Sequence, residues 1–422
     1  MKLTRHSLKG VILKLREAHW QQNQNMLSTA IASIKKKITL SQTSKAPRYF
    51  NISLSLKIGF ALVLLFTAFG NACLSYARMI RSGGDSWLAG DWLINYSGGF
   101  VRRGLFGEIF RTIFPNGQLG LWYLFIFQSC LYALMLFYFV RYLMKEKFSW
   151  VSIALICNPA AFAFVGWDTR AFARKESLGF VSLIVIAMAA QRVSNFSKSL
   201  KYLGVFCFIA SIFMSEINAI MLPSVVYLLA NSFRSGQHKA RSIIEVSLIS
   251  LTSLIALALT LVSPGTILQR EIICGSLQEI GLNKELLCGG AISSIGATYR
   301  EVQKILIEDL FPQYLGYLPL LVIATIPIFL TSWFRKNRFW VLFIFLFSAP
   351  LYSAVWDYGR LIHIFIIQIT ILVISKGTEE KTHYAWNPLS VILFVTLWGV
   401  PHYGYIAWGT NSALRLLESL FY

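Results

Sequence analysis

Long uncharged apolar segments, separated by short charged ones, dominate the pattern of hydrophobic and polar positions in this chain. A helix needs roughly 20 mostly apolar residues to cross the hydrocarbon of a bilayer. Segments near that length are Ile58–Ala77, Gly120–Val140, Trp150–Trp167, Leu178–Ala190, Ile243–Val262, Tyr314–Trp333, Phe339–Trp356, Leu361–Ser375 and Pro388–Trp408. The Leu178 and Leu361 segments are the shortest of them. Each predicts a membrane-spanning helix.

A further apolar stretch lies between Lys201 and Arg234 and is too long for one ordinary span. Ser215–Glu216 and then Pro223 interrupt it, and both of its ends are basic. It therefore predicts two short helices that meet near Glu216. Together the segments predict an all-α, polytopic integral membrane protein with about eleven transmembrane helices.

Composition excludes the other broad classes of protein. The 422 residues are 56% hydrophobic and only 14% charged, with a mean hydropathy of +0.58, whereas soluble domains commonly contain about 25% charged residues. Six cysteines are too few for a disulfide-dense scaffold. A formal net charge of +20 is found in nucleic-acid-binding proteins, but those chains are usually polar.

The distribution of the charge predicts the orientation of the chain, because Lys and Arg near span ends stay preferentially in the cytoplasm. The region before Ile58 holds 11 basic residues and one acid, which places the N-terminus inside. Alternation of the spans then puts 25 basic residues and five acids inside, and 14 of each outside. The net charge is therefore a topology signal, and it requires no nucleic-acid partner.

Three regions follow from this topology. Residues 1–57 form a basic cytoplasmic region, residues 58–408 a transmembrane domain with periplasmic loops 78–119 and 263–312, and residues 409–422 a short periplasmic tail. The first region has no apolar core of a signal peptide. Its apolar residues recur near helical spacing and precede Lys35–Lys37, which predicts an amphipathic helix on anionic lipids of the inner leaflet; a specific partner is the alternative.

The first outer loop contains a candidate phosphate clamp. Apolar residues from Val101 to Phe114 recur on one helical face, which predicts an amphipathic helix in the outer interface. Its first turn would present Arg102 and Arg103, shortly after Gly98-Gly99. Guanidinium groups match phosphate oxygens bidentately, so the pair predicts a site for a lipid-linked phosphate or diphosphate. Snorkelling to lipid headgroups is the alternative.

Acids near this clamp could act on a sugar hydroxyl. Asp85 and Asp91 are six residues apart, which is not the spacing of an Asp-x-Asp metal motif. Either could be a catalytic base or accept a hydrogen bond from a sugar, or be a solvated loop acid. The second outer connection, Asp168–Glu176, adds Asp168, Arg170 and Lys175 as candidate phosphate or sugar contacts, with a solvated loop as the alternative.

Glu216 is the most informative single residue. It is the only charge among roughly thirty apolar positions, and such residues are usually functional or paired. It could form a structural ion pair with an outer arginine. Alternatively, burial would favour its protonated form and suit it to take a proton from a sugar hydroxyl.

Two further features belong to the outer side. Arg360 and His363 are one turn apart near Asp357, so both can face one cavity, although a lone His is often only a core residue; His402 is a weaker candidate. Cys274 and Cys288 share the largest outer loop, where an oxidising periplasm would permit a disulfide. No metal site and no cofactor motif is predicted.

The order of these motifs resembles a known family. GGFVRRGLFGE follows the first span, RKESLGF opens a later span, SEINAIMLP lies mid-chain, CGGAISSIG ends a two-Cys loop, and DYGR closes the series. Together, over roughly Asp85–His402, they resemble the Wzy-type repeat-unit polymerases of bacterial O-antigen and capsule synthesis. These proteins are similar in outline to the polyprenyl-linked GT-C glycosyltransferases.

The resemblance implies transfer of a glycan linked to undecaprenyl diphosphate in the bacterial inner membrane, at its periplasmic face. Arg102, Arg103 and Arg360 would stabilise charge on the leaving diphosphate, and Glu216, Asp91 or His363 would deprotonate the acceptor hydroxyl. A chain-length regulator and a flippase would be partners. The chain has Ser215 where the family commonly has a His before the acid, and it lacks Asp-x-Asp, so neither an imidazole there nor a metal is implied.

Two other functions remain open at this point. A flippase or transporter of lipid-linked oligosaccharide would also need an arginine-lined cavity, and the break at Ser215–Pro223 favours it. A ligase or single-sugar transferase would use the same polyprenyl-linked donor. The sequence alone does not separate these from a polymerase.

Overall fold

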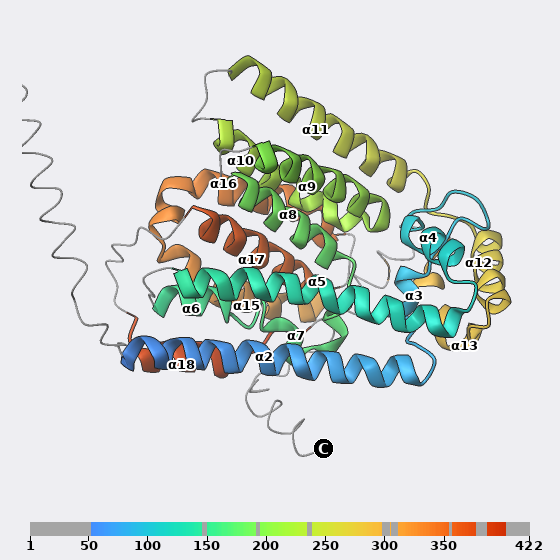
Figure 1. The fold of residues 1–422 in the computed structure, drawn as a ribbon, viewed down its shortest axis with the longest axis horizontal. Coiled ribbons are helices and arrows are strands. Elements are labelled where there is room, and N and C mark those ends of the chain that lie inside the picture. Colours follow the sequence, from blue (N-terminus) through green and yellow to red (C-terminus); the bar gives the residue numbers. More distant parts are fainter. Residues whose placement is uncertain are drawn as a thin grey trace, which may run out of the picture. The chain divides into compact units, whose positions relative to one another are not determined.

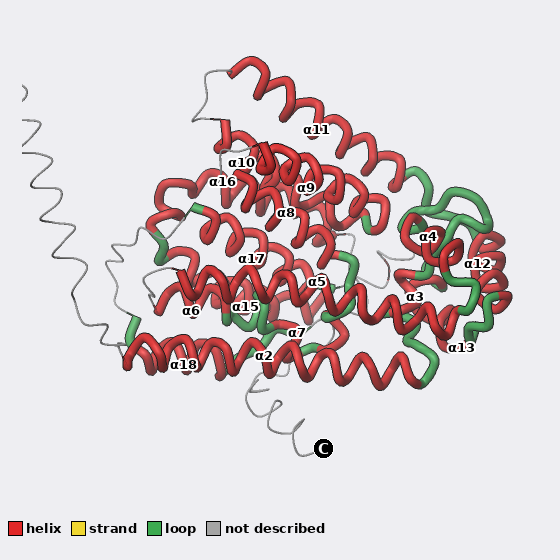
Figure 2. Tube along the Cα trace, viewed as in Figure 1, coloured by secondary structure: helices red, strands yellow, loops and turns green. Residues whose placement is uncertain are grey.

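A computed structural model describes residues 52–145, 150–190, 195–233, 239–297, 304, 311–353, 357–376 and 386–401. The chain forms two units, residues 1–55 and 56–422, and the fold below belongs to the second. Every element of secondary structure in the described ranges is helical, as the sequence predicts (Figure 2). The amphipathic helix predicted before residue 52, the tail 409–422 and His402 lie outside these ranges.

Five helices are long and apolar enough to cross a membrane, by length and composition. They lie within α2 (Ile52–Arg81), α5 (Gly117–Lys145), α9 (Asn195–Met214), α11 (Lys239–Leu261) and α17 (Tyr358–Ser375). The remaining apolar helices are shorter, among them α8 (Glu176–Ala190), α10 (Leu222–Phe233) and α15 (Phe311–Phe329). This is the composition of a membrane protein, while the eleven spans and the GT-C architecture stay predictions.

Two predicted spans are wrong as continuous helices. In Pro388–Trp408, helix α18 (Pro388–Thr396) ends after nine residues, and residues 397–401 are not helical. The segment Trp150–Trp167 is interrupted as well. It consists of α6 (Trp150–Ile156), a turn, and α7 (Phe164–Trp167). A proline disfavours helical backbone at the residue before it, and Pro159 follows Asn158 at the turn. Asn158 stabilises the break: its Oδ1 accepts from the Ala160 N–H, and its Nδ2 donates to the Ala324 carbonyl.

The chain also breaks where Glu216 interrupts the apolar stretch, as the sequence predicts. After α9 the backbone is extended at Ser215, and a 3-10 helix, η2 (Glu216–Met221), leads into α10. The Asn218 Nδ2 donates to the Ser211 carbonyl, which also accepts from the Ser215 N–H, and this contact joins η2 to the end of α9. The break therefore places a charged side chain between α9, which is long enough to cross a membrane, and the shorter α10.

Helix α17 lies at the centre of the bundle (Figure 1). All 18 of its residues are buried, although they form an apolar segment long enough to span a membrane. It packs against α8, α10, α15 and α16 (Ser332–Ser348). In contrast, α11 contacts α9, α10 and η2 and leaves many apolar side chains exposed, as expected for a lipid-facing helix.

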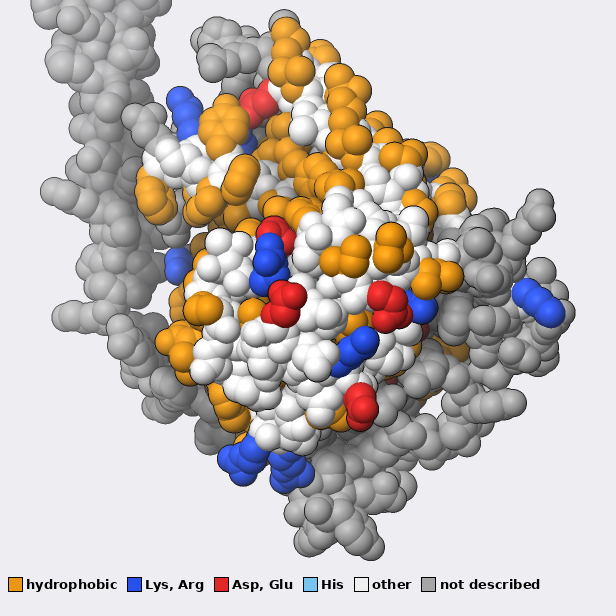
Figure 3. Space-filling model, turned by 90° about the vertical axis from the view of Figure 1, so that its right-hand side faces the viewer, with side chains coloured by type: hydrophobic (Ala, Val, Ile, Leu, Met, Phe, Trp, Pro, Cys, Tyr) orange, Lys and Arg blue, Asp and Glu red, His pale blue; other side chains and the backbone are white. Residues whose placement is uncertain are grey.

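Short helices gather at one end of the bundle, on the right in Figure 1, and we call them the cap. They are α3 (Ala89–Trp92), α4 (Leu105–Ile113), α12 (Ile267–Glu279), α13 (Lys284–Leu287) and a π-helical turn, Cys288–Ile292. A disulfide joins Cys274 to Cys288. Acidic and basic side chains are dispersed over the face of this end of the molecule in Figure 3, with apolar side chains around them.

Candidate functional site

The two arginines of the first outer loop lie in a tight turn before α4. Helix α4 begins at Leu105, so the prediction that a helix starts at Val101 with both arginines in its first turn is wrong. The reason lies in the backbone. Arg103 has a φ of 69°, the one positive value for a non-glycine residue in the described ranges, and the Arg102 N–H donates to the Ser263 carbonyl. The turn directs both guanidinium groups inward.

Arg103 and Glu216 form a bidentate ion pair. Arg103 Nε donates to Oε2 at 2.9 Å and to Oε1 at 3.1 Å, and Nη2 donates to Oε1 at 2.6 Å. Arg102 Nη1 lies 3.6 Å from the same Oε1. Such forked, charge-assisted contacts are the strong ones in proteins. They stabilise the ionised carboxylate, against the expectation that burial would favour the protonated form of Glu216.

Asp91 and Lys175 are buried next to Arg103, on the inner side of this ion pair. Lys175 Nζ donates to the Arg103 carbonyl at 3.0 Å and lies 3.7 Å from Asp91 Oδ1, which is also 3.7 Å from Arg103 Nη1. Burial alone would raise the pKa of Asp91, but Lys175 and Arg103 bring it below its usual value. Burial lowers the pKa of Lys175 to about 8. Asp91 is therefore a fixed anion.

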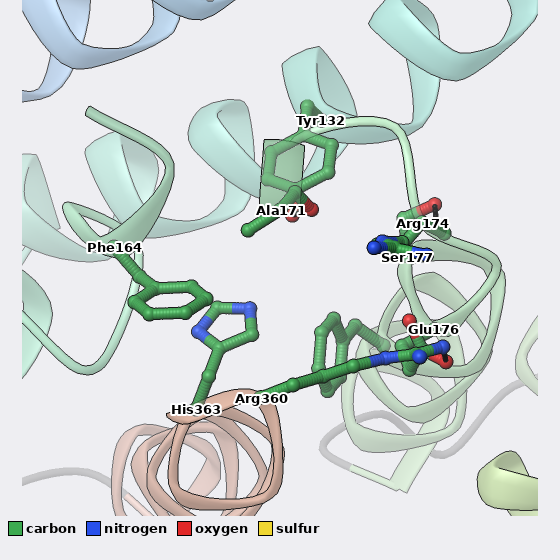
Figure 4. Close-up of a pocket in the computed structure, with 9 residues that line it drawn as sticks. Tyr132, Phe164, Ala171, Arg174, Glu176, Ser177, Arg360 and His363 are labelled. Carbon is green, nitrogen blue, oxygen red and sulfur yellow. Dashed lines mark hydrogen bonds and ion pairs between the residues drawn. The ribbon is translucent and has the colours of Figure 1, made fainter. Parts of the chain in front are cut away.

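A second group of charges lies around Arg360 (Figure 4). Arg360 Nη2 donates to Glu176 Oε1, and its Nη1 lies 3.2 Å from Asp357 Oδ2. Arg360 and Glu176, with Arg174 and His363, line a cavity of about 10 Å³, close to the volume that one water requires. Burial and the neighbouring Arg360 lower the pKa of Arg174.

His363 lies on the apolar side of the same cavity (Figure 4). Its ring stacks on Phe164 at 4.5 Å and meets Phe180 edge-on. Its Nδ1 is 3.1 Å from the Ala160 carbonyl, which can only accept, so Nδ1 carries the hydrogen and Nε2 is the basic nitrogen of the neutral ring.

Together these groups form one charged cluster of five basic and four acidic side chains. Its members are Asp91, Arg102, Arg103, Arg174, Lys175, Glu176, Glu216, Asp357 and Arg360. They come from α3, the turn before α4, the start of α8, η2 and the start of α17. Arg102 and Arg103 are its most exposed basic members, with side chains that are 25% and 21% exposed.

The predicted site residues divide into two sets. Arg102, Arg103, Lys175, Asp91, Glu216 and Arg360 converge in the charged cluster, and His363 lines the cavity beside it. Asp85 has a local role, because its Oδ1 accepts from the N–H groups of Trp87 and Leu88. The Asp168 carbonyl accepts from the Ala171 N–H, and the Arg170 side chain lies outside the described part of the structure.

Glu176 was missed by the sequence reasoning, although it pairs with Arg360 from a position 184 residues away. The Lys175-Glu176 doublet at the start of an apolar segment was the available signal. No group of three or more His, Cys, Asp or Glu side chains suited to a metal occurs among the described residues.

Comparison with family models, curated proteins and solved structures finds no match to this chain. The fold and the site therefore define it only as a class, that of all-helical proteins with membrane-length apolar helices around a buried charged cluster.

Proposed function

We propose that the protein is a membrane glycosyltransferase that polymerises oligosaccharide repeat units linked to undecaprenyl diphosphate, at the periplasmic face of the inner membrane. The observation that carries the proposal is the charged cluster, where five basic side chains converge at one end of a bundle of apolar helices. Charges buried among apolar helices are costly, and they commonly mark a substrate site. The repeat units would belong to O-antigen or capsule.

The arginine pair is the candidate site for the diphosphate. Burial and the adjacent Arg103 both lower the pKa of Arg102, so an anion bound here would relieve the repulsion between two guanidinium groups. During glycosyl transfer the leaving diphosphate gains negative charge, and donors that already point at that position lower the barrier most effectively. Arg360 is the candidate third contact, at the inner side of the charged cluster.

Three groups could accept the proton of the acceptor hydroxyl. Asp91 is held by Lys175 and Arg103, Glu216 is held by Arg103, and His363 offers Nε2 at the small cavity. A base must lie within hydrogen-bond reach of the hydroxyl in the bound complex, where paired groups can rearrange. All three therefore stay candidates for the proposed reaction.

An apolar cavity beside the charged cluster would accommodate part of the polyprenyl chain. It has a volume of about 340 Å³ and lies among α15, α16 and α17. It is lined by Tyr317, Leu318, Leu321, Phe345, Ala349, Tyr352, Tyr358 and Ile362. Tyr358, which lines the cavity, directly follows Asp357 of the charged cluster, so the cavity lies close to that side of the cluster.

Reconstitution with lipid-linked repeat units tests the proposal. The wild-type protein should convert them into a ladder of products on a gel, and Arg103→Ala should not. Arg111→Ala is the matched control, because this cap arginine pairs with Glu108 and lies outside the charged cluster. Full elongation by Arg102→Ala, Arg103→Ala and Glu216→Ala alike would show that the site is wrongly assigned. A single discrete product would indicate a ligase or single-sugar transferase.

A flippase is the second candidate, and the non-helical break at Ser215 favours it, because transporters bind substrates at broken helices. Movement of a labelled lipid-linked sugar across the bilayer of proteoliposomes, without polymer formation, would support this function instead. The position of the charged cluster at one end of the bundle, beside the cap, favours the transferase.

A further inference from the structure

We propose that Glu216 is a resident anion that occupies the phosphate site of the arginine pair, and that the incoming substrate phosphate displaces it and thereby frees the catalytic base. The reaction that follows the displacement, transfer of the glycan, rests on the proposed function. The exchange of anions itself rests only on the geometry of the charged cluster.

The geometry makes the two anions mutually exclusive. Carboxylates and phosphates use the same forked contact with a guanidinium group, through two oxygens that lie in its plane. Glu216 already occupies the Nε and Nη2 edge of Arg103, and its Oε1 is also the atom nearest to Arg102. A phosphate that bridges both arginines through this edge must therefore replace Glu216.

Exposure shows from which side the exchange would occur. The Arg102 and Arg103 side chains are 25% and 21% exposed, whereas the Glu216 side chain is 9% exposed. An anion therefore meets the guanidinium groups first. Arg103 is held from behind by Asp91, and its carbonyl by Lys175, so the arginine keeps its place while the carboxylate moves.

Displacement changes the chemistry of Glu216. Paired with Arg103, the carboxylate is a weak base; separated from it in a buried site, it takes up a proton readily. The acceptor hydroxyl gives its proton to the freed Glu216 as its oxygen attacks the anomeric carbon of the donor. The bond from that carbon to the diphosphate oxygen breaks, and its electron pair leaves with the diphosphate on the arginines. After product release, Glu216 passes the proton to water and returns to Arg103.

Anion binding to the full-length protein in detergent tests the exchange. Glu216→Gln removes the competing charge and keeps the size of the side chain, so it should bind inorganic pyrophosphate and undecaprenyl phosphate about tenfold more tightly than wild type. The same variant should lose chain elongation. Glu271→Gln is the matched control, because it removes an exposed cap carboxylate that pairs with Arg270 and Lys284, and it should change neither measurement.

A second variant protects the test against a folding defect. Glu216→Asp keeps the charge but shortens the side chain, so it should also bind both ligands more tightly and retain part of the elongation. Unchanged or weaker binding by both variants, in protein that elutes as a folded species, would overturn the exchange. Tighter binding of the lipid alone would assign the site to a lipid phosphate; tighter binding without any wild-type elongation would reject the transferase and keep the exchange.

Discussion

Lys175 acts on the site through the backbone. The sequence predicted it as a contact to phosphate or sugar, but its side chain is fully buried between Asp91 and the Arg103 carbonyl. A non-glycine residue at positive φ costs free energy, which surrounding contacts must offset. The contact from Lys175 to the Arg103 carbonyl holds the backbone in this conformation, so Lys175 positions the guanidinium that pairs with Glu216.

The lowered pKa of Lys175 predicts how stability depends on pH. Below about pH 8 the lysine is protonated in both the folded and unfolded states, and the cost of burying its charge is fully present. Between about pH 8 and the usual lysine pKa of 10.5, only the unfolded state keeps the proton, so the folded state gains up to about 3 kcal/mol. The melting temperature of wild type should therefore rise relative to Lys175→Met over this range. A difference between the two proteins that stays constant with pH would contradict the prediction.

A double-mutant cycle should measure the coupling of Arg103 and Glu216. Arg103→Ala leaves a buried carboxylate without its main partner, which typically costs about 3–5 kcal/mol in the free energy of unfolding. Removing Glu216 as well should recover much of that loss, because no unpaired charge remains. The free energy of unfolding is measured in one detergent for the two single variants and the double variant. Losses that simply add in the double variant would contradict the coupling.

The sequence could identify Glu216 and the arginine pair because each stands out locally, as a lone charge in an apolar stretch or as a doublet after Gly-Gly. Their partnership was left open, because the two are 113 residues apart and no spacing rule connects them. The role of Asp85 was left open, between catalysis and a contact within the loop, for the opposite reason. Its hydrogen bonds to the N–H groups of Trp87 and Leu88 are local turn contacts, which an acid in a loop provides as readily as a catalytic role.

At the scale of elements, α4 depends on a close approach of two backbones. A Cβ added at Gly107 would lie 2.0 Å from the Ile94 carbonyl oxygen. The helix can therefore lie against the loop that follows α3 only with glycine at this position. This contact places the turn that carries Arg102 and Arg103 over η2.

Gly107→Ala should accordingly displace α4 and destabilise the cap by a few kcal/mol, about the range of overpacked cores. Elongation should fall with it, because the arginine pair moves. Gly275→Ala provides the control: this helical glycine of α12 has open space around it, and alanine there should be neutral or stabilise by up to about 1 kcal/mol. Equal melting temperatures for both variants would argue against the close approach.

Helical elements were predictable from apolar length, and their interruptions only in part. Pro223 and Glu216 predict the break at η2, because a proline and a charge both disfavour a continuous apolar helix. The break at Asn158 was missed, because the segment around it is apolar enough for a span. The side-chain contact from Asn158 to the Ala324 carbonyl, which supports the turn there, is tertiary and leaves no local pattern.

At the scale of the whole molecule, the distribution of basic residues predicts which end of the bundle faces the cytoplasm. The cap, with its disulfide, should lie in the periplasm, where thiols are oxidised. Alkaline phosphatase, which is active only after export, should therefore be active when fused after Gly281 in the cap. Fused after Lys145 at the end of α5, it should be inactive. The reverse pattern would invert the topology and place the charged cluster on the cytoplasmic side.

The complete burial of α17 has a consequence for how the protein is made. The helices that surround it, α8, α10, α15 and α16, all precede it in the chain and emerge from the ribosome first. Until α17 is present, these helices lack the central helix against which they pack, and Glu176 lacks its partner Arg360. Packing of the bundle is thus completed only after all four of these helices have been made, when α17 follows them and brings Arg360 with it.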